Sequence, residues 1–146
     1  MIPPETYLEA ATEHADLAQE LYNTGWHGPA HYVAGLAVEC MLRAYRVRSD
    51  PEFDSRHDLR ELTRQAAFYD RVPPERHEIM SLHMSEVIQR WSNEHRFRSR
   101  KAILKWLKTQ RSNWRIKGDL LKESARRISN AALALVAEGV LRWGAA

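Results

Sequence analysis

The stretch His31-Tyr-Val-Ala-Gly-Leu-Ala-Val-Glu-Cys-Met-Leu-Arg-Ala-Tyr-Arg-Val-Arg48 decides the fold. Between Tyr32 and Tyr45 its residues are apolar or small, and only Glu39 and Arg43 carry charge. A helix that is apolar around its whole circumference belongs in the interior of a protein. The stretch therefore predicts a buried central helix against which the rest of the chain packs.

The two charges in this helix stand four residues apart, so their side chains meet on one face. An unpaired buried carboxylate costs several kcal/mol, and we therefore predict that Glu39 pairs with Arg43. Two interpretations of the pair remain open. It is either a structural ion pair that orients a core helix, or part of a functional site, where perturbed ionisable groups gather.

The remaining chain also has a helical pattern. Apolar residues recur at spacings of three and four, prolines and turn residues mark the boundaries, and no stretch alternates with period two. The expected helices span residues 3–23, 28–50, about 58–68, 73–91, 101–109 and 119–143, with an irregular stretch at 92–100 and a connector at 110–118. Four long helices with short connectors predict an all-α, up-and-down helical bundle, with residues 1–146 as one domain.

Composition excludes several classes of protein. The longest uninterrupted apolar run, 131–137, is far shorter than the roughly 18–20 residues of a membrane span. The N-terminus has no basic and apolar signal pattern, and Cys40 is the single cysteine, which excludes an internal disulfide. We therefore expect a cytoplasmic protein without a membrane partner.

Charge is distributed unevenly along the chain. Residues 1–89 contain eight Lys and Arg against fifteen Asp and Glu, a net charge of −7. Residues 90–127 contain thirteen against three, a net charge of +10. This basic segment predicts an anionic partner, although such a run is also compatible with a solvated face or with attraction to the acidic half. The candidate nucleic-acid contacts are Arg98, Arg100, Lys101, Lys105 and Lys108.

Three motifs resemble one known family. The run from Tyr32 through Glu39 to Arg43 resembles the second helix of HEPN (higher eukaryote and prokaryote nucleotide-binding) domains, in which a Gly precedes Ala-Val-Glu. His57-Asp-Leu-Arg-Glu-Leu62 is similar to the His-x-Leu-x-x-Leu that follows there. Trp91-Ser-Asn-Glu-His-Arg-Phe97 is similar to Trp-x4-Arg-Tyr, with Phe in place of Tyr. The resemblance implies a HEPN-like bundle over roughly residues 5–143.

The resemblance also implies a reaction. Many HEPN domains are metal-independent ribonucleases with an Arg-x4-His-x-Tyr motif. Arg90, His95 and Phe97 match this motif, except that Phe97 lacks the tyrosine hydroxyl. Trp91 is a second departure, because the residue after the arginine is usually polar in active members. The implied catalytic set is His95 as general acid and base, Arg90 or Arg96 as phosphate clamp, and Glu39 orienting the site. A histidine titrates near neutral pH and a guanidinium binds phosphate oxygens in a fork, which suits this chemistry.

Three functions remain open at this stage. The first is an RNA-binding protein that cleaves RNA as a toxin or defence endoribonuclease, acting as a homodimer, with a nucleotidyltransferase antitoxin as the implied partner. The second is a non-catalytic HEPN module that binds a nucleotide, RNA or a protein. The third is a peripheral membrane protein that uses the basic helix 101–109, which is short for that role.

No cofactor or metal is predicted. His27 and His31 have a metal-like spacing, but we expect Gly28 and Pro29 to break the helix that would align them. The sequence contains no glycine-rich phosphate-binding loop. Three tryptophans lie among the basic residues and either stack on bases or anchor the core, namely Trp91, Trp106 and Trp114.

Overall fold

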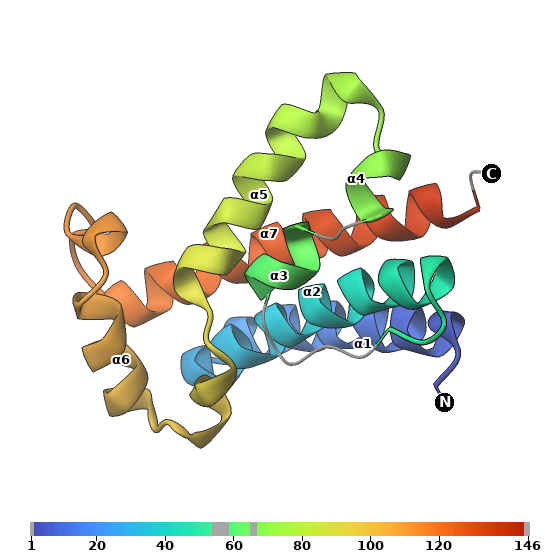
Figure 1. The fold of residues 1–146 in the computed structure, drawn as a ribbon. Coiled ribbons are helices and arrows are strands. Elements are labelled where there is room, and N and C mark those ends of the chain that lie inside the picture. Colours follow the sequence, from blue (N-terminus) through green and yellow to red (C-terminus); the bar gives the residue numbers. More distant parts are fainter. Residues whose placement is uncertain (1, 54–58, 65–66, 145–146) are drawn as a thin grey trace.

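The computed structural model describes residues 2–53, 59–64 and 67–144, and their regular structure is entirely helical (Figure 1). No strand occurs within these ranges. The all-α helical bundle predicted from the sequence is therefore confirmed. His57 and Asp58, which open the second motif, lie outside the described residues.

The central layer consists of α1 (Pro4–Asn23), α2 (His27–Ser49) and α7 (Leu120–Trp143), which lie side by side (Figure 1). Helix α1 ends in a turn at Gly25, whose φ of 88° suits glycine, and the chain reverses there into α2. Of the 23 residues of α2, 14 are buried. The prediction of a buried central helix is therefore confirmed.

Helix α7 approaches α2 closely because it is lined with small residues. A Cβ on Gly139 would lie 2.8 Å from the Met41 Cγ, so a larger residue would force the Met41 side chain to shift. The hydroxyl of Tyr45 donates a 2.6 Å hydrogen bond to the Gly139 carbonyl. Asp119 caps the start of α7 by accepting from the Lys122 N–H.

The segment after α2 differs from the prediction. A single helix is expected over about 58–68, but the structure has α3 (Leu59–Arg64) and α4 (Ala67–Arg71). The apolar spacing predicts Leu59, Leu62 and Ala66 on the inner face. Leu59 and Leu62 are buried, and Ala66 lies outside the described residues. The spacing does not show that the segment forms two helices.

Helix α5 (His77–Arg90) follows a short 3-10 turn, η1 (Pro74–Arg76), and packs mainly against α7 (Figure 1). After α5 come η2 (Asn93–Phe97), α6 (Arg100–Lys108) and η3 (Arg111–Asn113). The stretch expected to be irregular, 92–100, thus contains a 3-10 helix. Ile103, Leu107 and Leu121 form a small second core that holds α6 against the start of α7.

The predicted ion pair in α2 is present. The Arg43 Nε lies 3.9 Å from a Glu39 carboxylate oxygen, and both side chains are largely buried. A second buried carboxylate, Glu138 on α7, accepts a 2.6 Å hydrogen bond from the Arg76 Nε. None of the helices in the described residues combines the length and apolar composition that a membrane crossing requires.

Candidate nucleic-acid interface

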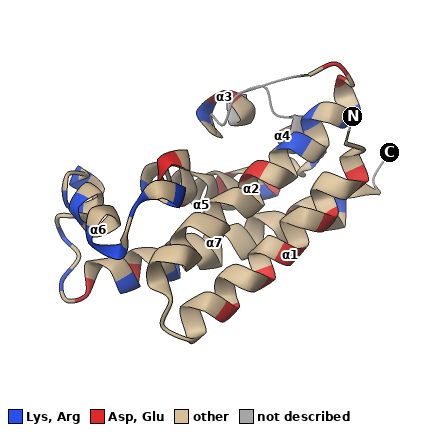
Figure 2. Ribbon diagram, turned by 90° about the horizontal axis from the view of Figure 1, so that it is seen from below, with Lys and Arg blue, Asp and Glu red and all other residues tan. Residues whose placement is uncertain are grey.

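Basic side chains gather at the end of the molecule formed by η2, α6 and η3. Figure 2 shows lysines and arginines on and around α6, whereas α1 contains Asp and Glu but no Lys or Arg. On α6 itself, the side chains of Lys101, Lys105 and Lys108 are exposed. They face solvent because Ile103 and Leu107 occupy the buried side of this strongly amphipathic helix.

A pocket of about 490 Å³ opens between the start of α2 and the start of α6. We call it the arginine pocket. One part of its lining is apolar or aromatic, and the other is cationic, with no Asp or Glu among the lining residues. These are Trp26, Gly28, Pro29, Tyr32, His95, Arg96, Arg98, Ser99, Arg100 and Ile103.

The N-terminus of α6 contributes to the same pocket. Ser99 caps the helix by accepting a 3.2 Å hydrogen bond from the Ala102 N–H. The first turn of α6 contains no acidic residue. Free backbone N–H groups and the positive end of the helix dipole therefore act together with Arg96 and Arg100, an arrangement that favours an anion.

His95 lies on η2, and its side chain both lines the arginine pocket and packs into the interior, with 2 % of its surface exposed. Its Nδ1 accepts a long, 3.4 Å hydrogen bond from the Ser92 N–H. In the neutral ring the proton therefore sits on Nε2. This Nε2 is buried and has no hydrogen-bond partner.

Burial, followed by the nearby Arg98 charge, lowers the pKa of His95 from 6.5 to about 4. The imidazole is therefore neutral at pH 7. The sequence predicted a cleft histidine that titrates near working pH, and the structure instead places a neutral, largely buried one.

His31, at the first turns of α2, is the neighbour that the sequence analysis considered only as a metal ligand. Its ring meets that of His95 edge to face, with 5.2 Å between the centroids. Its Nε2 lies 2.8 Å from the Ser124 hydroxyl oxygen, and its Nδ1 has no partner. Burial first, and then His95 and Arg90, lower the pKa of His31 well below 6.5.

The expected break between His27 and His31 is wrong, because α2 already begins at His27. A proline is tolerated in the first turn of a helix, where its missing N–H would have no partner. The described residues contain no group of three or more His, Cys, Asp or Glu that could hold a metal ion.

Arg90, at the end of α5, is 1 % exposed and does not line the arginine pocket. Its guanidinium donates to Glu86 (2.5 Å), to the Asn113 amide oxygen (2.6 Å) and to the Ser124 hydroxyl (3.3 Å). Asn113 in turn donates to the Leu107 carbonyl, which ties η3 to α6. Arg90 is thus linked to His31 through the Ser124 hydroxyl, inside the protein.

Of the other predicted catalytic residues, Arg96 is exposed and lies in the arginine pocket, whereas Glu39 lies elsewhere. Glu39 follows His31 by eight residues on α2, which is about 12 Å along the helix. It lines neither this pocket nor the other large one. The structure therefore brings His95, Arg96, Arg98 and Arg100 together and leaves Glu39 out.

Sequence reasoning missed Ser124 and Asn113, which hold the buried guanidinium. Neither residue has a signal in the sequence, because both stand among charged or polar neighbours and their partners come from distant segments. The tryptophans have different roles. Trp91 is 7 % exposed and donates to the Tyr32 carbonyl as a core anchor, whereas Trp114 is 67 % exposed.

Comparison of the chain with family models, with curated proteins and with solved structures gives no match.

Proposed function

We propose that this protein binds single-stranded RNA through η2, α6 and the arginine pocket. The observation that carries the proposal is the pocket lining, which contains no Asp or Glu and brings Arg96, Arg100 and the α6 N-terminus to one cavity. Arg98 also lines this cavity while it donates to the Glu94 carboxylate at 3.0 Å. Phosphate is the anion that such a set of donors suits. The exposed lysines of α6 extend the same positive surface beyond the pocket.

The aromatic part of the pocket favours nucleic acid over a free anion. Trp26 is 57 % exposed at the rim, and Tyr32 lines the interior. Phe97 is 77 % exposed on η2 beside the Arg96 guanidinium, 4.6 Å from its ring centroid. Exposed rings beside cations are the stacking platforms of proteins that bind single strands, where unpaired bases offer their faces.

Fluorescence anisotropy with a labelled, unstructured RNA 12-mer tests the proposal. Arg96→Gln and Arg100→Gln should each weaken binding about tenfold, because each removes a charged hydrogen-bond donor. Arg46→Gln, which alters an arginine on α2 outside the pocket, is the matched control and should bind like the parent protein. Absence of RNA binding at low salt would refute the proposal.

Metal-independent RNA cleavage is a second candidate, and one observation favours it. The His31 and His95 rings are in contact, and each has one ring nitrogen without a hydrogen-bond partner. In the reaction the 2′-oxygen attacks phosphorus, its proton passes to a base, and the 5′-oxygen leaves with a proton from an acid. The products are a 2′,3′-cyclic phosphate and a 5′-hydroxyl. Because both rings are nearly inaccessible, substrate reaches them only if η2 moves.

This second candidate is tested with labelled RNA in excess EDTA. Cleavage is supported if a cyclic-phosphate product forms from RNA and does not form from a 2′-deoxy substrate. Its rate of formation should fall at least 100-fold in His95→Gln. RNA that binds and stays intact assigns the protein to the non-catalytic class, with Trp91 and Phe97 as the departures from the cleavage motif.

Two partner predictions rest on the family resemblance. A homodimer finds support in the exposed apolar side chains Leu133, Val140 and Leu141, beside a groove of about 410 Å³ between α1 and α7. Light scattering coupled to size-exclusion chromatography measures the molar mass in solution, and a monomeric mass would contradict the homodimer. A nucleotidyltransferase partner rests on the resemblance alone.

A further inference from the structure

The basic surface of α6 continues past the end of that helix. Residues 98–118 contain eight Lys and Arg and no Asp or Glu. Figure 2 shows basic residues on α6 and also on the segment that joins α6 to α7. In this segment, which includes η3, the side chains of Arg111, Arg115 and Lys117 are exposed. The proposed RNA contacts on η2 and α6 therefore account for only part of the positive surface.

An exposed indole stands within this additional basic segment. Trp114 follows η3 directly, and 67 % of its surface is exposed. The Arg111 guanidinium lies over this ring, with its carbon 5.5 Å from the ring centroid. Phe97 and Arg96 on η2 form the same kind of pair, an exposed ring beside a guanidinium. The basic end of the molecule thus carries one such pair before α6 and another after it.

The fold holds the Trp114 indole in a fixed orientation. Its ring nitrogen donates to the Lys108 carbonyl at 3.3 Å, at the C-terminal end of α6. The preceding residue, Asn113, is buried, and its amide donates to the Leu107 carbonyl and accepts from the Arg90 guanidinium. A ring that is already oriented loses little freedom when a ligand stacks on it. Exposure and a fixed orientation together suit a stacking platform.

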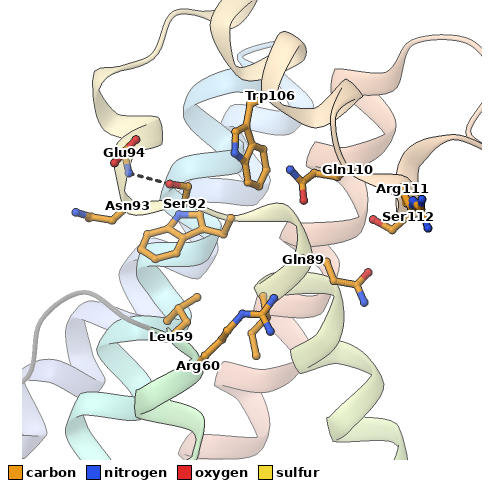
Figure 3. Close-up of a pocket in the computed structure, with 12 residues that line it drawn as sticks. Leu59, Arg60, Gln89, Ser92, Asn93, Glu94, Trp106, Gln110, Arg111 and Ser112 are labelled. Carbon is orange, nitrogen blue, oxygen red and sulfur yellow. Dashed lines mark hydrogen bonds between the residues drawn. The ribbon is translucent and has the colours of Figure 1, made fainter.

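Trp106, the tryptophan of α6, has a different position. Figure 3 shows its indole directed into a cavity of about 660 Å³, whereas Arg111 lies at the edge of that cavity on η3. The Trp106 ring also meets the His95 ring edge to face, with 4.7 Å between the centroids. Of the two tryptophans in residues 98–118, only Trp114 is exposed.

A row of lysines joins the arginine pocket to Trp114. Lys101, Lys105 and Lys108 stand four and three residues apart, so they follow one face of α6. From Arg100 to Lys108 the helix rises about 12 Å. Stacked nucleotides advance about 3.4 Å each, so roughly four of them cover this distance. A strand with a phosphate in the arginine pocket therefore needs only a few more nucleotides to reach the indole.

From these contacts we infer that Trp114 stacks on one base of the RNA strand whose phosphate the arginine pocket holds. The inference rests on the proposed RNA binding and extends its interface across α6 to η3. Stacking uses the flat face that every base has, so the contact adds affinity without selecting a sequence. The Arg111 guanidinium beside the ring suits a neighbouring phosphate.

Fluorescence anisotropy with the labelled RNA 12-mer, and with an abasic strand of equal length that keeps the ribose and phosphates, tests the inference. Trp114→Ser should weaken RNA binding about tenfold, within the range for one stacked base, and leave binding of the abasic strand unchanged. Trp114→Phe should keep most of the affinity, because it keeps a ring. Leu82→Ser on α5 is the matched control, since Leu82 is 63 % exposed outside the basic end, and should bind like the parent protein.

The outcomes separate this inference from the proposed function. A loss below about twofold in Trp114→Ser, an equal loss for both strands, or a Trp114→Phe variant as weak as Trp114→Ser overturns the stacking contact and leaves RNA binding standing. If Trp114→Ser instead lowers binding to phosphatidylserine vesicles and not to RNA, the ring is a membrane contact and the inference is overturned. Absence of RNA binding in the parent protein overturns both proposals. Circular dichroism of each variant, expected to match the parent spectrum, shows that the helical fold persists.

Discussion

Gly35 on α2 lies directly against the indole of Trp91. A Cβ at position 35 would lie 2.0 Å from the Trp91 Cδ1, which no packing adjustment of a rigid ring accommodates. Two of the sequence motifs thus meet in space, because the glycine of the first motif makes room for the tryptophan that opens the third. The contact fixes the point where the chain leaves α5 and enters η2.

Gly35→Ala is expected to lower the free energy of unfolding by about 1–3 kcal/mol, because overpacking forces Trp91 out of place. Gly28→Ala, in the same helix, is the matched control. Its Cβ would lie 3.6 Å from the Ile103 Cδ1, an ordinary contact. Urea denaturation measures both, and equal losses in the two variants would contradict the proposed role of Trp91.

Because His31 and His95 are buried together, we expect the stability of the fold to fall at acidic pH. Both pKa values are lowered, that of His95 to about 4, so the folded state takes up these protons less readily than the unfolded chain. Their contribution to stability is complete above about pH 6.5 and is lost as the pH falls toward 4.

Urea denaturation between pH 7.5 and 4.5 measures this effect. His31→Asn combined with His95→Asn should flatten the fall in stability over that range, whereas His14→Asn on α1 should leave it unchanged. If the double variant retains the parent slope, the two histidines are not its source.

Arg90 and Arg96 are expected to separate stability from binding. Arg90→Met should cost about 2–4 kcal/mol of stability, because it leaves the buried Asn113 oxygen without its donor and removes a charge-assisted network. Arg96→Met, at an exposed position, should change stability by less than about 0.5 kcal/mol and weaken RNA binding instead. Urea denaturation measures stability and fluorescence anisotropy measures RNA binding. If Arg90→Met weakens RNA binding with little loss of stability, Arg90 is the phosphate clamp after all.

The lysines of α6 are expected to set the salt dependence of RNA binding. Replacing Lys101, Lys105 and Lys108 with Gln should reduce the slope of log affinity against log salt, by about 0.7 for each phosphate of a single strand that the variant no longer neutralises. Replacing Glu9, Glu13 and Asp16 on α1 with amides serves as the control and should leave the slope unchanged. An unaltered slope in the lysine variant would remove α6 from the interface.

The Glu39–Arg43 pair is expected to matter for stability. Arg43→Ala should cost about 3 kcal/mol, because it takes this cation away from a carboxylate whose side chain is 3 % exposed. Adding Glu39→Gln should recover part of the loss, since the amide carries no charge to bury. A loss under about 1 kcal/mol at pH 7 would show that the pair contributes as little as a surface ion pair.

The sequence by itself determined the class of fold. Helical spacing of apolar residues, bounded by prolines and glycines, is a local signal, and it located α1, α2, α5, α6 and α7 to within a few residues. The composition of α2 also identified the central helix and its ion pair, because an all-apolar helix has to be buried and a charge within it has to be paired.

Only the tertiary structure decided which candidate residues share a site. Arg90 and His95 are five residues apart, yet the first is held by Asn113 and Ser124 while the second faces His31 and the arginine pocket. Burial and hydrogen-bond partners come from segments distant in sequence, so residue spacing alone does not specify them. The same holds for the lowered pKa of His95, which burial in the assembled fold produces.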